Sequence, residues 1–151
     1  MSGYTKSFTV RWADCDANGH MRNTAYSEYG IDVRIAYLSE HGFGYEQFAA
    51  NGFGPVLLRE EIDYLREVRL GETVSVDYTQ LGLSPDAARF RIQHAFTKAS
   101  GKPSARIVLS GGWMDLRTRR LIAPPEALAT VLRGVPRGDA FVELPPLTAR
   151  G

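Results

Sequence analysis

The sequence has a single cysteine, Cys15, so it cannot form a disulfide bond within one chain. Folds that depend on several internal disulfides are therefore excluded, and a free thiol is compatible with a reducing compartment. The first residues contain no apolar run of the kind found in signal peptides, which leads us to expect a cytoplasmic protein. No stretch of the sequence approaches the roughly 20 apolar residues that a membrane-spanning helix needs.

The sequence also lacks an excess of charge of either sign, because 18 Lys and Arg residues nearly balance 17 Asp and Glu residues. Proteins that bind nucleic acid usually present a basic surface to the phosphates, so we expect no nucleic-acid partner. The sequence has no His and Cys cluster with metal-ligand spacing, no glycine-rich nucleotide loop and no G-x-S-x-G turn. We therefore expect neither a metal nor a cofactor.

One long helix is predicted over residues 24–41, because large apolar side chains recur there at spacings of three and four. These side chains are Tyr26, Tyr29, Val33 and Tyr37. Asn23 or Thr24 is expected to cap the start of this helix. Gly42 fits the position just past its end, where glycine often stops a helix.

Elsewhere apolar and polar residues alternate, which indicates strands with one buried face. These stretches lie at residues 7–12, 56–68, 73–81, 88–96 and 105–116. Short turns join the last four stretches, so their strands should be largely antiparallel. A helical turn is expected within 43–54 and a short helix from Pro124 to Gly134, and we expect the tail from Gly138 to Gly151 to be loosely held.

The predicted order is strand, helix, four strands and a small helix, which is typical of an α+β architecture. The length of 151 residues fits one domain over residues 1–151, with a core at about 7–135. The long helix has one apolar face and should cover one side of the sheet. The remaining face or edge needs its own cover, which favours a homo-oligomer.

A carboxylate, an amide and an imidazole lie within five residues just before the long helix, at Asp16, Asn18 and His20. Asp16 could attack a carbonyl carbon as a nucleophile or activate a water as a general base. Asn18 could orient that water, and His20 could donate a proton to the developing oxyanion or to the leaving group. Unpaired backbone N–H groups at the helix start, near Asn23 and Thr24, would polarise the carbonyl.

The same residue types also form turns and helix caps that have no chemical role. From the residues alone, both interpretations of this loop stay open. Asp14 is a rival carboxylate, because residues two apart on an extended segment face the same side. Asp16 is favoured because it holds the spacing to His20 and Asn23.

Residues 12–26, with the sequence W-A-D-C-D-A-N-G-H-M-R-N-T-A-Y, resemble the signature of the hotdog thioesterases. In form they are closest to the pattern D-x-N-x-H-x-x-N-x-x-Y of the acyl-ACP thioesterase branch. They are also similar to the D-x-D-x-x-G loop of the 4-hydroxybenzoyl-CoA thioesterase branch. Weaker similarity in the strand segments extends the match to roughly residues 7–130.

This resemblance implies a hotdog fold, in which an antiparallel five-stranded sheet wraps around one long helix. It implies dimers that pair edge to edge, or dimers of such dimers, with the active sites at the dimer interface. It also implies that Asp16 is the catalytic carboxylate and that Asn23, at the helix start, polarises a thioester carbonyl. Asn18 and His20 would support catalysis, and Asn23, Thr24 and Tyr26 would contact the substrate.

The function that follows is hydrolysis of an acyl-CoA or acyl-ACP thioester to a free acid and a thiol. Arg22 departs from the acyl-ACP branch, which usually has Val-Asn-Asn after the histidine, where this chain has Met21, Arg22 and Asn23. The carrier is therefore left open between CoA and ACP.

Two other functions remain as alternatives. One is a hotdog hydratase acting on enoyl thioesters, although the loop lacks the proline and the following aspartate of the N-P-x-H-x-D pattern. The other is a module that binds acyl-CoA without catalysis. Among other residues, Glu60 could assist catalysis, Arg117, Arg119 and Arg120 could contact CoA phosphates, and His94 fits a core histidine. Cys15 is a poor nucleophile because its acidic neighbours raise the pKa of a thiol.

Overall fold

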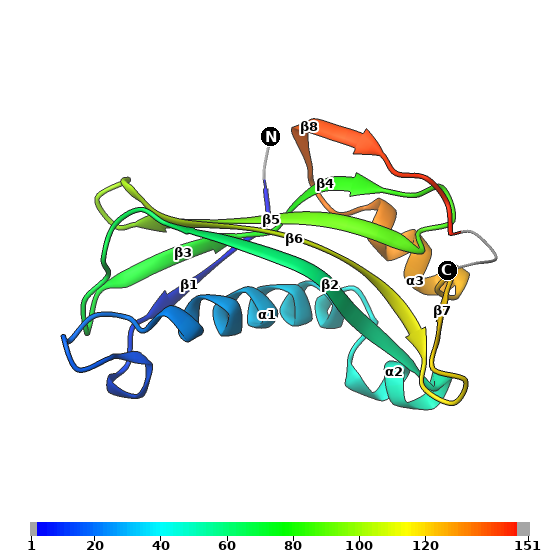
Figure 1. Cartoon of the computed structure of the whole chain (residues 1–151), viewed down its shortest axis with the longest axis horizontal. Coiled ribbons are helices and arrows are strands. Elements are labelled where there is room, and N and C mark those ends of the chain that lie inside the picture. The colour runs from blue at the N-terminus through cyan, green and yellow to red at the C-terminus, as the bar shows by residue number, and fades with distance from the viewer. Residues whose placement is uncertain (1–2, 148–151) are drawn as a thin grey trace.

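A computed structural model describes residues 3–147 of the chain (Figure 1). The elements follow in chain order as β1 (Thr5–Thr9), the 3-10 turn η1 (Trp12–Asp14), α1 (Asn23–Glu40), α2 (Tyr45–Asn51), β2 (Phe53–Tyr64), β3 (Thr73–Asp77), β4 (Thr79–Leu83), β5 (Arg89–Lys98), β6 (Pro103–Asp115), β7 (Arg120–Ile122), α3 (Glu126–Arg133) and β8 (Arg137–Glu143). No helix within residues 3–147 is long and apolar enough to span a bilayer.

All strands join one sheet, which arches over α1 (Figure 1). Its body has the order β1-β3-β5-β6-β2, and every neighbouring pair in that row is antiparallel. β4 continues the path of β3 along β5, while β7 pairs with β6. The sheet wrapped around a single long helix confirms the predicted α+β hotdog architecture. The structure adds the short strands β7 and β8 and divides the strand predicted over 73–81 into β3 and β4.

The apolar stripe of α1 faces the concave side of the sheet. Tyr26, Tyr29, Val33 and Tyr37 are each at most 5% exposed, as the sequence spacing predicts. Tyr29 stacks on Phe8 of β1 with ring centroids 4.7 Å apart, and Tyr26 packs on Phe96 of β5 at 5.2 Å. Because the stripe contacts two different strands, β1 and β5, the direction of α1 and the position of its first turn are fixed.

The two ends of α1 differ in how well the sequence predicts them. Gly42 has φ +85°, a conformation that favours glycine, and α1 ends just before it, as expected. The predicted cap at Asn23 or Thr24 is wrong, because the helix begins at Asn23 and Arg22 is the capping residue. Arg22 makes no side-chain cap hydrogen bond, so the first N–H groups of α1 are not covered by a conventional cap.

Two predicted strands have different bounds in the structure. The first ends at Thr9, and Trp12 lies in the turn η1 with 77% of its surface exposed, not on a buried face. The strand expected over 73–81 is interrupted at Tyr78, where the Asp77 carboxylate accepts the N–H of Ala95 in place of a regular ladder bond.

The segment after α3 contains a strand that the sequence analysis missed. β8 runs parallel to β4, and Gln80 donates its backbone N–H to the oxygen of Pro136. Leu144 packs onto Gly82, where a Cβ would meet the leucine side chain at 2.9 Å. β8 and Leu144 are therefore attached to the sheet, and Leu147 donates its N–H to Asp86 in the loop after β4. Residues 148–151 of the predicted tail lie outside the described part.

Gly111 of β6 lies where the sheet bends around the interior. It is opposite Leu57, beside a bulge between Leu57 and Arg59 of β2. A Cβ on Gly111 would clash with the backbone oxygen of Val56 and meet Cζ of Phe90 at 2.8 Å. The absence of a side chain at Gly111 therefore allows the ring of Phe90 to lie against β6.

Replacing Gly111 with alanine should lower the free energy of unfolding by about 1–3 kcal/mol, because the site has no room for a methyl group. Gly54 of β2 is the matched control, since a Cβ there meets nothing within 4 Å. The Gly54→Ala variant should change stability by less than about 1 kcal/mol. Urea unfolding measures both, and equal stability of the two variants would contradict this description of the β2–β6 contact.

Candidate active site

The loop between η1 and α1 is held by the buried side chain of Asp14, which is 1% exposed. Its carboxylate accepts two hydrogen bonds of 3.1 Å from Arg11 and one of 2.7 Å from the hydroxyl of Tyr29 on α1. The Arg11 guanidinium is the main cause that lowers the pKa of Asp14 to about 2, and the Tyr29 hydroxyl adds to it. Asp14 is therefore ionised and committed to joining η1 to α1.

Arg22 fastens the other end of the loop. Its guanidinium donates to the backbone oxygen of Ala13 at 2.5 Å, to Oγ1 of Thr24 at 2.9 Å and to the carboxylate of Glu28 at 3.1 Å. Its backbone N–H donates to the oxygen of Asp14. The residue that departs from the acyl-ACP signature thus connects the loop to the first turns of α1.

Asp16 lies on the exposed side of this loop. Its Oδ1 accepts the backbone N–H groups of Asn18 at 2.9 Å and His20 at 3.2 Å, and its own N–H donates to the oxygen of His20. Gly19 turns the chain with φ +74°. Oδ2 of Asp16 has no hydrogen-bond partner among residues 3–147. One carboxylate oxygen therefore fixes the loop while the other stays open.

His20 is positioned by the segment that leads into β3. It forms a bridge with Arg69, and its Nε2 lies 3.1 Å from Oε2 of Glu67. Because a carboxylate only accepts when ionised, Nε2 carries a proton in this contact. The imidazole is about one third exposed, so it can reach solvent or a ligand at the loop surface.

α1 begins directly after this loop, and Asn23, its first residue, lies beside Asp16 and His20. The backbone N–H groups of Asn23 and Thr24 have no hydrogen-bond acceptor in the described part of the chain. This is the expected state of a helix start, and the helix dipole favours a partial negative charge there.

These residues meet in an open groove of about 340 Å³. The groove is lined by Asp16, His20, Met21, Asn23, Tyr26, Tyr64, Leu65, Arg66 and Glu67. Four of the six predicted site residues are therefore brought together. Asn18 and Thr24 are not on the walls: Asn18 is exposed in the turn, and the Thr24 hydroxyl accepts a hydrogen bond from Arg22.

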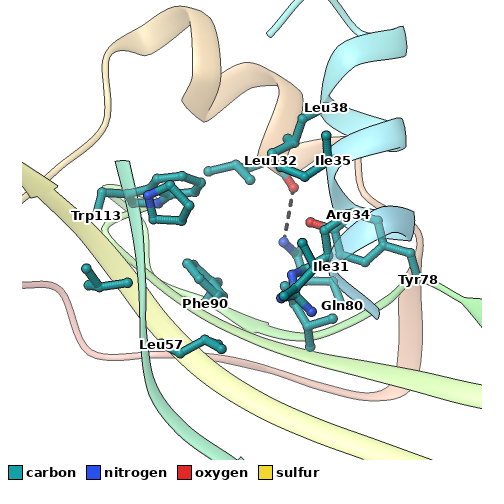
Figure 2. Close-up of a pocket in the computed structure, with 13 residues that line it drawn as sticks. Ile31, Arg34, Ile35, Leu38, Leu57, Tyr78, Gln80, Phe90, Trp113 and Leu132 are labelled. Atoms are coloured by element: carbon teal, nitrogen blue, oxygen red, sulfur yellow. Dashed lines mark hydrogen bonds between the residues drawn. The ribbon is translucent and has the colours of Figure 1, made fainter. Parts of the chain in front are cut away.

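A second cavity of about 310 Å³ lies between α1 and the sheet and shares no lining residue with the groove (Figure 2). Phe90 and Trp113 form one wall, while Arg34, Tyr78 and Gln80 gather on the other. Sequence reasoning missed these polar residues, because the meeting of Arg34 on α1, Gln80 on β4 and Tyr78 between β3 and β4 follows only from tertiary packing. No group of three His, Cys, Asp or Glu residues within 3–147 could hold a metal ion.

The stability of the loop should depend on pH through Asp14. The pKa of Asp14 is depressed in the folded chain, so its ionised form stabilises the fold above about pH 4, and this contribution is lost as pH falls toward 2. Asp14→Asn should cost about 1–2 kcal/mol near pH 7, a range reduced because Arg11 is exposed. Thermal unfolding from pH 7 to pH 2 measures this, with Asp63→Asn as an exposed control. A pH profile unchanged in Asp14→Asn would refute the assignment.

The comparison with protein families gives one match, which covers most of the chain. The model of the thioesterase-like superfamily matches residues 10–132. No curated protein is matched by the sequence.

Several solved structures are similar over most of their length. Protein SAV2348 from Staphylococcus aureus, solved in complex with CoA, has a TM-score of 0.80 at 23% identity, over 97% of this chain and 89% of that one. The 1,4-dihydroxy-2-naphthoyl-CoA thioesterase Slr0204 from Synechocystis has a TM-score of 0.79 at 19% identity, over 88% and 97%. The DHNA-CoA thioesterase from Staphylococcus aureus has a TM-score of 0.75 at 18% identity, over 85% and 90%. By its sequence match and its fold, the chain belongs to the thioesterase-like superfamily of hotdog proteins.

Proposed function

We propose that the chain hydrolyses an acyl-CoA or acyl-ACP thioester to a free acid and a thiol, with Asp16 as the catalytic carboxylate. The observation that supports this most directly is the shared groove, in which Asp16 lies on one surface with Asn23, the first residue of α1, whose backbone N–H is unpaired in the described chain. Membership of the superfamily and the likeness to a protein solved with CoA support the substrate class.

Asp16 has two routes to the same products. As a general base, it takes a proton from water while the water oxygen bonds to the thioester carbon. As a nucleophile, it forms an acyl-aspartyl anhydride that water then opens. In both routes the C–S bond breaks after the carbonyl oxygen has become an oxyanion. Both routes require an unblocked carboxylate oxygen, and Oδ2 meets that requirement.

The oxyanion would be stabilised by the backbone N–H groups of Asn23 and Thr24. A single preorganised donor of this kind lowers a barrier by roughly 2.7–4 kcal/mol in well-studied enzymes. The Asn23 side chain is exposed, and Tyr64 donates to the Asn23 backbone oxygen at 3.4 Å. Asn23 therefore acts through its main chain in this proposal.

His20 would supply a proton from Nδ1 to the departing thiolate, while Glu67 accepts a hydrogen bond from Nε2–H and holds the ring. Asn18 supports Asp16 through its backbone N–H, and Thr24 supports the loop by accepting a hydrogen bond from Arg22. Tyr26 is buried and forms part of the groove wall beside Tyr64. Asn18, Thr24 and Tyr26 therefore have positioning roles in this proposal. Asp16, His20 and the N–H groups at the helix start would contact the reacting atoms.

We also propose that the chain works as a homodimer joined along β2. Among the described strands, β2 pairs only with β6, so its outer edge is unpaired. Large apolar side chains are exposed on and near this edge. They are Leu57, Leu58, Tyr64 and Leu65 of the β2 region and Ile31 and Ile35 of α1. A second copy would satisfy the free strand edge and cover this apolar surface.

Replacing Asp16 with asparagine should reduce kcat by at least about 100-fold, the usual scale for a positioned acid–base group. Asparagine keeps an oxygen that can accept the N–H groups of Asn18 and His20, so the loop should persist. Thiol release from a panel of acyl-CoA and acyl-ACP substrates measures the effect. Asp32→Asn, an exposed change on α1, is the control and should retain full activity. Wild-type rates in Asp16→Asn would remove Asp16 from the mechanism.

The same assay separates the alternative functions. A binding module would retain acyl-CoA without releasing thiol, and a hydratase would consume crotonyl-CoA by adding water to its double bond. A binding module does not need the open carboxylate beside the helix start. Thiol release by the unaltered protein is therefore the first result to obtain.

The dimer should be sensitive to charge on β2. Leu58 is 64% exposed at the free edge, so Leu58→Lys should convert a dimer to monomers by placing two like charges near each other. Leu116→Lys is the control, because Leu116 is similarly exposed but lies after β6. Sedimentation equilibrium gives the mass of each. A dimer that survives Leu58→Lys unchanged would place the interface elsewhere.

A further inference from the structure

The cavity between α1 and the sheet is apolar except at one wall (Figure 2). Residues from α1, β2, β5, β6 and α3 supply aliphatic and aromatic surfaces suited to an acyl chain. On the remaining wall, Arg34 of α1 lies beside Gln80 of β4 and Tyr78. A cation in such a place needs a physical explanation, because an apolar chain alone gives it no partner.

Arg34 is held by a neutral histidine. Its NH1 lies 2.9 Å from Nε2 of His94, and Nδ1 of His94 lies 2.6 Å from the backbone oxygen of Asp77. A carbonyl oxygen only accepts, so Nδ1 carries the proton and Nε2 accepts from Arg34. Burial lowers the pKa of His94 to about 4, which keeps the ring neutral near pH 7. His94 therefore orients the guanidinium without neutralising its charge.

No carboxylate of the described chain pairs with Arg34. Glu60 is the acidic residue whose field acts on it, but Glu60 accepts a hydrogen bond of 2.6 Å from Ser27 and is not within the 4.0 Å of an ion pair. The guanidinium of Arg34 thus borders the cavity without an ion-pair partner among the described residues. Isolated buried charges are far more costly than isolated buried dipoles, so the charge decides which ligand fits best.

Gln80 provides a second, independent indication that a polar group of a ligand or a water belongs in the cavity. Its side chain is 1% exposed, and its Nε2 donates to the backbone oxygen of Leu132 at 3.1 Å. This contact fixes the amide, yet Oε1 is buried without a hydrogen-bond partner. Buried polar atoms in native proteins nearly always have a partner, so Oε1 indicates that a ligand or a bound water belongs beside it.

We propose that the cavity takes an acyl chain whose far end carries a carboxylate. Arg34 binds this carboxylate, and a water donates one hydrogen bond to it and one to Oε1 of Gln80. This substrate class, the ω-carboxyacyl thioesters, rests on the proposed hydrolase function. The guanidinium matches a carboxylate in charge and in geometry, because it presents parallel N–H donors. The aliphatic and aromatic walls cover the methylene groups between the thioester and that carboxylate.

A distal hydroxyl is the competing occupant, since one hydroxyl could accept from Arg34 and donate to Gln80. It would satisfy both hydrogen bonds but leave the charge of Arg34 uncompensated. An uncharged methyl end would satisfy neither residue. A site for a carboxylate, a site for a hydroxyl and a site for a methyl group therefore predict different orders of preference among substrates that differ only at the far end of the chain.

The test uses the unaltered protein and three CoA thioesters of equal length, namely octanoyl-CoA, 8-hydroxyoctanoyl-CoA and octanedioyl-CoA. Thiol release gives kcat/KM for each. We expect octanedioyl-CoA to be favoured over octanoyl-CoA by at least about 10-fold, with the hydroxyl form between them. Equal values, or preference for the methyl or hydroxyl end, would overturn the proposal. A carboxylate supplied by a partner subunit to Arg34 would produce that contrary result.

Variants of Arg34 assign the preference to this residue. Arg34→Met should lower kcat/KM for octanedioyl-CoA far more than for octanoyl-CoA and so abolish the preference, and Arg34→Lys should keep part of the preference. Arg91→Met, an exposed change on β5, is the control and should preserve the wild-type order. If Arg34→Met does not fold, Arg34→Lys and the substrate comparison still decide the question. A preference that survives both Arg34 variants would overturn the assignment to Arg34.

Binding of the free acids separates this proposal from the proposed function. Calorimetry with octanedioate and octanoate needs no turnover, and the dicarboxylate should bind at least about 10-fold more tightly to the unaltered protein than to Arg34→Met. Thiol release without a carboxylate preference would refute the inference and leave the hydrolase proposal intact. Arg34-dependent binding of octanedioate without thiol release would refute the hydrolase proposal alone.

Discussion

The candidate site depends on the burial of one carboxylate, that of Asp14. Its contacts with Arg11 and Tyr29 join the end of η1 to the middle of α1, and its backbone oxygen accepts the N–H of Arg22. Once these contacts are made, the loop between η1 and α1 has little freedom. Asp16 is then directed to the exposed side, into the groove that the start of α1 also lines.

Asp14 and Asp16 also show how far the sequence could predict the site. Alternation would have placed both carboxylates on one face of a strand, so only the resemblance distinguished them. In the structure the strand ends at Thr9 and a 3-10 turn follows, which sends Asp14 inward and leaves Asp16 outside. The burial of Tyr29 on α1 was predictable from helical spacing, whereas its hydrogen bond to Asp14 was not.

Other features of the molecule arise only from packing between distant segments. Arg34 of α1 contacts His94 of β5 and shares a cavity with Gln80 of β4, next to the break between β3 and β4, where the oxygen of Asp77 holds His94. No local sequence pattern predicts these contacts, and an arginine on a helix usually lies at the surface. β8 was missed for a related reason, since its pairing with β4 stabilises a short segment that has weak strand character of its own.

In a single chain the groove at Asp16 and the apolar cavity are separate. The guanidinium of Arg34 reaches back along α1 to Gly30, where a Cβ would lie 3.4 Å from its NH1. Roughly 10 Å along the helix axis therefore separate it from Asn23, since a helix rises about 1.5 Å per residue. The proposed dimer along β2 adds a second copy beside the exposed rim of the cavity at Ile31, Ile35 and Leu57. In the two proposals, catalysis would take place at the helix start and selection of the acyl chain beneath the sheet, in different parts of one fold.

The central claim is that a thioester carbonyl binds between Asp16 and the first N–H groups of α1. A crystal structure with an acyl-CoA ketone analogue, in which a methylene replaces the thioester sulfur, tests it most directly. We predict the ketone oxygen at about 3 Å from the backbone nitrogen of Asn23 or Thr24, with Oδ2 of Asp16 facing the carbonyl carbon directly or through one water. A ketone bound away from this groove, with Asp16 in contact with neither carbon nor water, would contradict the account.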